Sequence, residues 1–141
     1  MITYLDVFKN EEIKTYIEQA DRSLIAMGFT EHCFAHVVRC ATVTSEILSK
    51  LGYDERTIEL SKIAGYMHDI GNVINRIDHA QSGAVMAFRI LDKMGMEPKE
   101  VARIITAIGN HDEHTAYPVS ELAAALILAD KSDVRRSRVR N

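Results

Sequence analysis

The stretch Ala64-Gly65-Tyr66-Met67-His68-Asp69-Ile70-Gly71-Asn72 places a histidine beside an aspartate at the end of an apolar helical segment. A charge in such surroundings is costly unless a cation or another partner compensates it. An adjacent His-Asp pair alone is weak evidence for a metal site, but further residues that could bind metal flank this stretch: His36 before it, and His79, His111 and Asp130 after it. Together these six nitrogen and oxygen ligands could hold two metal ions.

Three short motifs carry a resemblance to a known family: His36-Val37-Val38-Arg39-Cys40-Ala41, Met67-His68-Asp69-Ile70-Gly71 and Leu128-Ala129-Asp130-Lys131. In this order they resemble the HD-domain superfamily of metal-dependent phosphohydrolases, over residues 29–133. The histidines in Asp78-His79-Ala80 and Asn110-His111-Asp112-Glu113 are similar to the subset of that family that binds two metals. Asn72 departs from the pattern, because many members carry a lysine there, but the ligands are unaffected.

The resemblance implies a ligand set for each of two divalent metals. We expect one metal to take His36, His68, Asp69 and Asp130, and the second to take His79 and His111 with Asp69 as the bridge. This set has no thiolate, which disfavours structural zinc, and its mixture of imidazole and carboxylate suits manganese, iron, cobalt or zinc, with iron or manganese favoured. Two metals can hold a hydroxide that attacks a phosphate, so His68 and Asp69 are candidate catalytic residues.

Several charged residues are candidates for contact with the substrate. Lys131, next to Asp130, and Arg135, one turn later, could reach phosphate oxygens, and Arg76 in the loop after the His-Asp pair is a further candidate. His114 or Glu113 could protonate a leaving oxygen. The alternative for this last pair is a solvated loop without a catalytic role.

The composition is that of a globular protein with one domain over residues 1–141, of which 131–141 form a basic end. Hydrophobic residues make up 47% and charged residues 26% of the chain, and no run of 18 apolar residues occurs. The N-terminal residues lack the pattern of a secretion signal. Cys33 and Cys40 would lie about 10 Å apart along one helix, too far for a disulfide. We therefore expect a cytoplasmic protein with reduced thiols and no membrane partner.

The apolar periodicity is helical throughout and predicts an all-α, single-domain bundle of about six helices. The N-terminal residues 1–9 are expected to be irregular. Asn10, Asp54 and Ser120 are expected to cap helices, Pro98 to begin one, and Asp78 with Gln81 to form a capping box. The predicted helices span residues 11–27, 30–51, 55–71, 79–94 and 98–108, with a last helix from about residue 120.

The leading functional prediction is a phosphohydrolase that acts on a phosphomonoester or a nucleotide-type phosphate. One alternative is a di-iron oxygenase on the same ligands, and another is a module that senses a nucleotide without turning it over. Nucleic-acid binding through Arg135, Arg136, Arg138 and Arg140 is not expected, because a short charged end is usually solvated. A homodimer could form through the first helix and residues 1–8.

Overall fold

The computed structural model describes residues 1–29 and 34–133, and these residues form helices and connecting loops without any strand. The helices are α1 (Tyr4–Phe8), α2 (Glu11–Ala26), α3 (Phe34–Lys50), α4 (Glu55–Met67), the 3-10 helix η1 (Ile70–Val73), α5 (His79–Met94), α6 (Pro98–Gly109) and α7 (Glu121–Lys131). The all-helical prediction is confirmed. None of the described helices has the length and apolar character needed to cross a bilayer.

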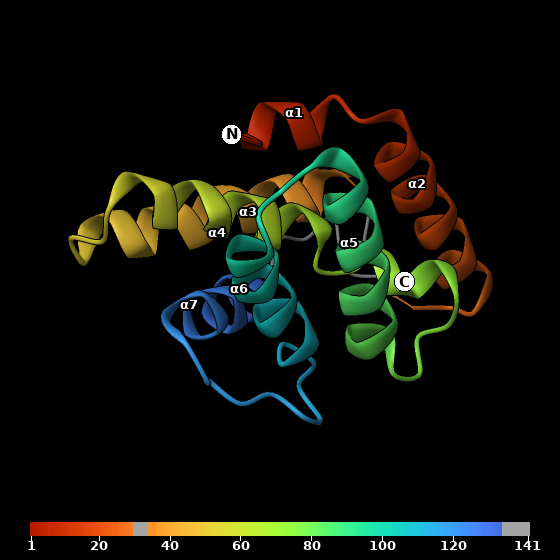
Figure 1. The fold of residues 1–141 in the computed structure, drawn as a ribbon. Coiled ribbons are helices and arrows are strands. Elements are labelled where there is room, and N and C mark those ends of the chain that lie inside the picture. The colour runs from red at the N-terminus through yellow and green to blue at the C-terminus, as the bar shows by residue number, and fades with distance from the viewer. Residues whose placement is uncertain (30–33, 134–141) are drawn as a thin grey trace.

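The helices pack around a pair formed by α3 and α4, which run side by side through the middle of the molecule (Figure 1). Helix α7 packs on α3, α6 packs on α4 and α5, and η1 lies between α2 and α5. One continuous core joins these elements, with large side chains such as Leu48, Ile63, Met67, Ile104 and Leu126 fully buried. The His-Asp pair lies where α4 ends and η1 begins, at the centre of this packing.

Most helix starts follow the capping signals in the sequence. The side chains of Asn10, Asp54 and Ser120 accept hydrogen bonds from the main-chain N–H groups of the first turns of α2, α4 and α7. Pro98 is the first residue of α6, where its missing N–H costs nothing. The predicted start of the second helix at Thr30 lies outside the described residues.

Three local predictions are wrong. Residues 1–9 are not irregular, because Thr3 and Asp6 form a capping box that starts α1. Helix α4 ends at Met67 and not at Gly71, since the chain tightens into η1. Asp78 adopts a left-handed conformation with φ of 58° and makes no capping hydrogen bond, while the Gln81 side chain donates to the Gly109 carbonyl.

The N-terminal segment packs inside the domain. The rings of Tyr4, Phe8 and Phe34 surround the ring of Tyr66, with centroid distances of 5.8, 5.5 and 6.5 Å. Part of the apolar surface that the sequence offered for a dimer is therefore covered by the chain itself. Helix α4 is fixed from this side, and its C-terminal end carries the His-Asp pair.

Candidate metal centre

Two close backbone contacts bring the other elements to the His-Asp pair. A Cβ atom at Gly65 would lie 2.7 Å from the Ala41 main chain, so only glycine lets α4 approach α3 this closely. A Cβ atom at Gly71 would lie 2.0 Å from the His79 carbonyl oxygen, so only glycine lets η1 touch the start of α5. These contacts place His36 of α3 and His79 of α5 beside the pair.

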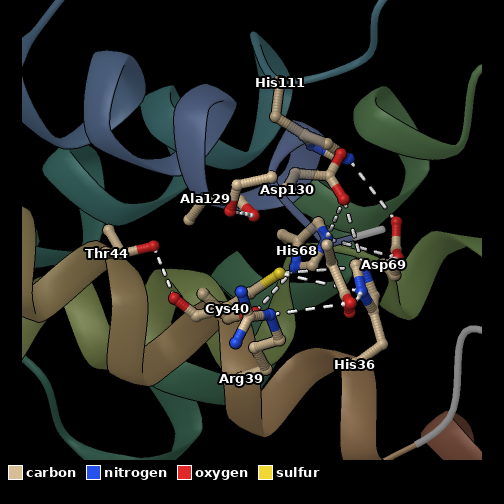
Figure 2. A network of polar contacts seen from close by, with 12 residues as sticks. His36, Arg39, Cys40, Thr44, His68, Asp69, His111, Ala129 and Asp130 are labelled. Carbon is tan, nitrogen blue, oxygen red and sulfur yellow. Dashed lines mark hydrogen bonds and ion pairs between the residues drawn. The ribbon is translucent and has the colours of Figure 1, made fainter. Parts of the chain in front are cut away.

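The first group of ligands comprises His36, His68, Asp69 and Asp130. The Nε2 atom of His36 lies 3.3 Å from Asp69 Oδ2 and 3.1 Å from Asp130 Oδ1. The Nε2 atom of His68 lies 3.2 and 3.4 Å from the same two oxygens. Figure 2 shows the side chains of these residues converging on one another. All but Asp130, whose side chain is 26% exposed, are almost fully buried.

The second group comprises His79, His111 and the other oxygen of Asp69. The Oδ1 atom of Asp69 lies 3.5 Å from His79 Nε2 and 3.5 Å from His111 Nε2, and these two nitrogens are 3.2 Å apart. Both histidines are buried. The structure thus brings together all six residues that the sequence singled out as ligands, with Asp69 between the two groups.

The hydrogen bonds of three rings set the direction of their lone pairs. The Nδ1 atoms of His68, His79 and His111 donate to the carbonyl oxygens of Gly65, Arg76 and Ile108, at 2.6, 3.0 and 2.6 Å. A carbonyl can only accept, so the Nδ1 atom carries the hydrogen. In the neutral ring the Nε2 atom then presents a lone pair to the centre, which is the arrangement of metal-binding histidines.

The spacing of the donor atoms fits coordination of an ion. Ligands about 2.1 Å from one ion lie roughly 3.0–3.5 Å from each other at tetrahedral or octahedral angles. The distances inside both groups fall in or close to this interval. The Nε2 atom of His68 is buried and makes no hydrogen bond of acceptable geometry, although two carboxylate oxygens lie near it. Such a nitrogen needs a cation or a proton in front of it.

The pKa values of these groups reflect the same crowding. Burial alone would lower the pKa of His36, but hydrogen bonds to Asp130 and Asp69 raise it to about 12. Burial would also lower the pKa of His68, but the charges of Asp69, Cys40 and Asp130 together raise it. Burial would raise the pKa of Asp130, but the contact with His36 and the nearby positive charge of His68 hold it well below its ordinary value. These directions show that the two carboxylates favour a positive charge on the rings, which a divalent cation at this position would supply instead.

Two further residues adjoin His36, of which Asp133 was missed in the sequence. Asp133 is buried, and its Oδ2 atom accepts from His36 Nδ1 at 2.9 Å. The sulfur of Cys40 lies 3.7 Å from His36 Nε2, within ligand distance of the first group. The only signal for Asp133 was its place three residues after Asp130, and a helical repeat of this kind is too common to indicate a site. Cys33 lies outside the described residues.

An open cleft of about 490 Å³ borders the second group. Arg76 and Asp112 belong to its wall, and both approach His79: the Arg76 Nη1 atom lies 3.5 Å from Nε2 and the Asp112 Oδ2 atom 3.9 Å from Nδ1. The Arg76 guanidinium also donates to Asn72 Oδ1 and lies over the Phe29 ring. The cleft is lined by Phe29, Arg76, Ile77, Asp78, Asp112, Glu113, His114 and Thr115.

The remaining predicted substrate contacts have different surroundings. His114 is 83% exposed and lies 3.8 Å from Glu113, at the cleft and away from the buried ligands. Lys131 is exposed at the end of α7. Arg135 lies outside the described residues. Asn72 is buried, and its side-chain amide donates to the Asp69 carbonyl, so it holds the His-Asp turn in place.

Comparison with known proteins identifies relatives of the same kind. A crystal structure of a predicted HD superfamily hydrolase from an uncultured Thermotogales bacterium superposes with a TM-score of 0.66 and 30% identity, over 85% of this chain and 65% of that one. The uncharacterized protein MJ1020 of Methanocaldococcus jannaschii is 25% identical over 97% of this chain and 61% of its own length. Ribonuclease Y of Latilactobacillus sakei is 28% identical over 72% of this chain and 18% of its own length.

The chain spans less than two thirds of the length of each of these proteins. The sequence model of the HD domain family matches residues 33–135, the segment that runs from the start of α3 past the end of α7 and includes all six ligand candidates. HD domains bind divalent metals, and the described His and Asp side chains form groups that could hold one. The chain belongs to the HD domain family.

Proposed function

We propose that this domain is a divalent-metal-dependent phosphohydrolase that releases phosphate from a phosphomonoester or a nucleotide-type phosphate. One observation carries the proposal: the two oxygens of Asp69 face different pairs of histidines, His36 and His68 on one side and His79 and His111 on the other. A carboxylate shared in this way suits a bridge between two ions. The similarity to HD superfamily hydrolases supports the reaction class.

In this proposal the first ion is held by His36, His68, Asp69 and Asp130, and the second by His79, His111 and Asp69. Such ions would activate water near neutral pH and offset the charge of the attacked phosphate. The buried imidazoles and carboxylates keep these positions rigid, because each ring is fixed by a second hydrogen bond at Nδ1.

Groups at the cleft would act on the substrate. Arg76 can contact a phosphate oxygen, since its guanidinium already lies beside His79 at the mouth of the second group. His114 can donate a proton to the leaving oxygen, because it is exposed at the cleft wall and free to approach a bound ester. Lys131 and Arg135 are assigned the outer phosphate contacts.

The charge of the cleft favours a small substrate. The described wall carries three carboxylates, of Asp78, Asp112 and Glu113, and one guanidinium, of Arg76. These side chains therefore make the electrostatic potential next to the second group negative. A long polyanion would meet three carboxylates there. Two relatives are named Ribonuclease Y, and their similarity supports hydrolysis of phosphate esters, but the acidic wall favours a small phosphate ester over RNA as the substrate of this domain.

The test is elemental analysis of the purified protein followed by phosphate release with each of Mn²⁺, Fe²⁺, Co²⁺ and Zn²⁺. The panel includes p-nitrophenyl phosphate, bis-p-nitrophenyl phosphate, nucleoside monophosphates, cyclic nucleotides and a short RNA. His68→Ala and Asp69→Ala are compared with Asp92→Asn, a control on the exposed side of α5. We expect close to two metals per chain and phosphate release in the wild type and the control. His68→Ala should lose one metal and phosphate release, and Asp69→Ala should lose both metals and phosphate release.

Other outcomes would point elsewhere. Fewer than one metal per chain, unchanged in His68→Ala, would overturn the proposal. Metal binding with tight nucleotide binding but no product would favour the sensing module. Activity that requires iron and consumes oxygen would favour the di-iron oxygenase, whereas phosphate release with Mn²⁺ in the absence of oxygen would exclude that alternative.

A further inference from the structure

His36 differs from the other three histidines of the centre in what holds its ring. His68, His79 and His111 each donate from Nδ1 to a neutral main-chain carbonyl. His36 donates instead to the carboxylate of Asp133, at 2.9 Å. An interaction with a charged acceptor is stronger and makes the opposite ring nitrogen a better electron donor.

Asp133 is a buried carboxylate whose two oxygens both face side chains of α3. Its side chain has no exposed surface, and a buried carboxylate is costly unless it is paired. Its Oδ2 atom contacts His36, while its Oδ1 atom lies 3.6 Å from Arg39 Nε. Arg39 and His36 both belong to α3, and Figure 2 shows them on adjacent turns beside Cys40. The carboxylate therefore links the segment directly after α7 to α3, the helix that carries His36.

We propose that Asp133 is a positioning residue that orients His36 and raises its affinity for metal, so that Asp133 sets the strength of the first metal group. This inference rests on the proposed function, because it assumes that His36 is a ligand. With Asp133 as acceptor, the Nε2 atom of His36 points at Asp69 Oδ2 and Asp130 Oδ1. Without it, the His36 ring could rotate or present the other tautomer. The first group would then lose the imidazole ligand that α3 supplies among the described residues.

The expected size of the effect follows from outer-shell partners in other metalloproteins. Loss of such a partner typically lowers metal affinity by about 10- to 100-fold. Asp133→Ala removes both the acceptor and the charge, so we expect a loss within that interval. Asp133→Asn keeps an oxygen that can accept from Nδ1 but removes the charge, so we expect a smaller loss, near the lower end.

The probe is Co²⁺ added to metal-free protein, with the dissociation constant obtained by competition with a chelator and the coordination followed by visible absorption. Each variant is made in the wild type and in His111→Ala, which removes one ligand of the second group and leaves the first complete. Asp92→Asn serves as the control, since that carboxylate is exposed on α5 and lies outside both ligand groups and the cleft. Thermal unfolding of the metal-free proteins is measured in parallel.

The inference predicts weaker Co²⁺ binding and an altered spectrum in both Asp133 variants, and no change in Asp92→Asn. If both Asp133 variants only unfold at lower temperature and bind Co²⁺ as the wild type does, Asp133 is structural and the inference fails. If the wild type binds Co²⁺ and His68→Ala loses the ion of the first group, the proposed metal centre stands whatever Asp133 does. If the wild type binds no Co²⁺, both proposals fall together.

Discussion

The Nε2 atoms of His79 and His111 lie 3.2 Å apart although both rings carry their hydrogen on the opposite nitrogen. In two neutral rings of this tautomer the facing lone pairs repel each other unless a cation or a proton lies between them. Burial lowers the pKa of His79 to about 4, so near neutral pH this ring does not supply the proton. The pair and the Asp69 oxygen beside it are therefore arranged to receive a cation.

The first prediction concerns metal stoichiometry. We expect His111→Ala to lose one of two bound ions and to keep the other, because the first group retains all four of its ligands. Elemental analysis after dialysis against a weak chelator measures this directly. His114→Ala is the control for metal content, since that ring is 83% exposed and lies outside both groups. Equal metal content in His111→Ala and the wild type would contradict the assignment.

Asp69 is predicted to affect both ions. Its two oxygens belong to different groups, so Asp69→Ala should lower the affinity for both ions. The loss should exceed the roughly 10- to 100-fold that is typical when an outer-shell partner is removed. His36→Ala should weaken only the first. Isothermal titration of metal-free protein with Mn²⁺ separates the two cases. A single affected ion in Asp69→Ala would show that the carboxylate does not bridge.

A matched pair of glycine substitutions tests how the fold positions the site. At Gly71 a new Cβ atom would lie 2.0 Å from the His79 carbonyl oxygen, whereas at Gly109 the nearest atom would be 3.6 Å away, on Ala84. We expect Gly71→Ala to lower the free energy of unfolding by about 1–3 kcal/mol or more, because η1 and α5 must separate. The same separation should lower the affinity of the second group for its ion. Gly109→Ala should leave metal binding unchanged. Chemical denaturation and metal titration measure the two effects, and an equal response of both variants would contradict the argument.

Local signals predicted most of the fold. Helices α2, α4, α6 and α7 begin where Asn10, Asp54, Pro98 and Ser120 indicate, because capping is decided by a few adjacent residues. The capping box expected at Asp78 is absent, since the tight connection from η1 forces that residue into a left-handed conformation. That requirement comes from the approach of η1 to α5 and is not contained in the spacing of Asp78 and Gln81.

The site could also be predicted in part. The family resemblance singled out the six ligand candidates, which lie on separate segments of the chain except for the adjacent His68 and Asp69. The second partner of each ring could not be inferred, because a main-chain carbonyl leaves no mark in the sequence and Asp133 looks like any aspartate after a helix. The cleft position of Arg76 depends on the loop that connects η1 to α5, two elements that pack on each other.

Arg76 is predicted to act in substrate binding. Its guanidinium lies beside His79 at the cleft, so Arg76→Ala should raise KM for a phosphomonoester by about tenfold, which corresponds to roughly 1.4 kcal/mol. The value of kcat should change less, since the metal ligands are intact. Lys93→Ala, an exposed cation on α5, is the control for overall charge. Steady-state kinetics at two salt concentrations measure KM and kcat for both variants. An equal change of KM in Arg76→Ala and Lys93→Ala would contradict the role of Arg76.

The last prediction concerns the ion pair that joins α4 to α6. Arg56 donates to both carboxylate oxygens of Glu100, at 2.6 and 2.7 Å, and this hydrogen bonding lowers the pKa of Glu100 below its ordinary value of 4.5. A lowered pKa in the folded protein means that the pair stabilises the fold above about pH 4.5 and that this contribution is lost as the pH falls through the folded pKa.

Glu100→Gln should therefore lower the melting temperature by a few degrees at pH 7, in keeping with about 1 kcal/mol for a solvent-screened, bidentate pair. The difference from the wild type should be smaller at pH 3 than at pH 7, because the charge of Glu100 is lost as the pH falls below 4.5 and through its lowered folded pKa. Metal-free protein is used, so that ligand binding does not contribute. A deficit that is equally large at both pH values would mean that packing, and not the charge of Glu100, stabilises this contact.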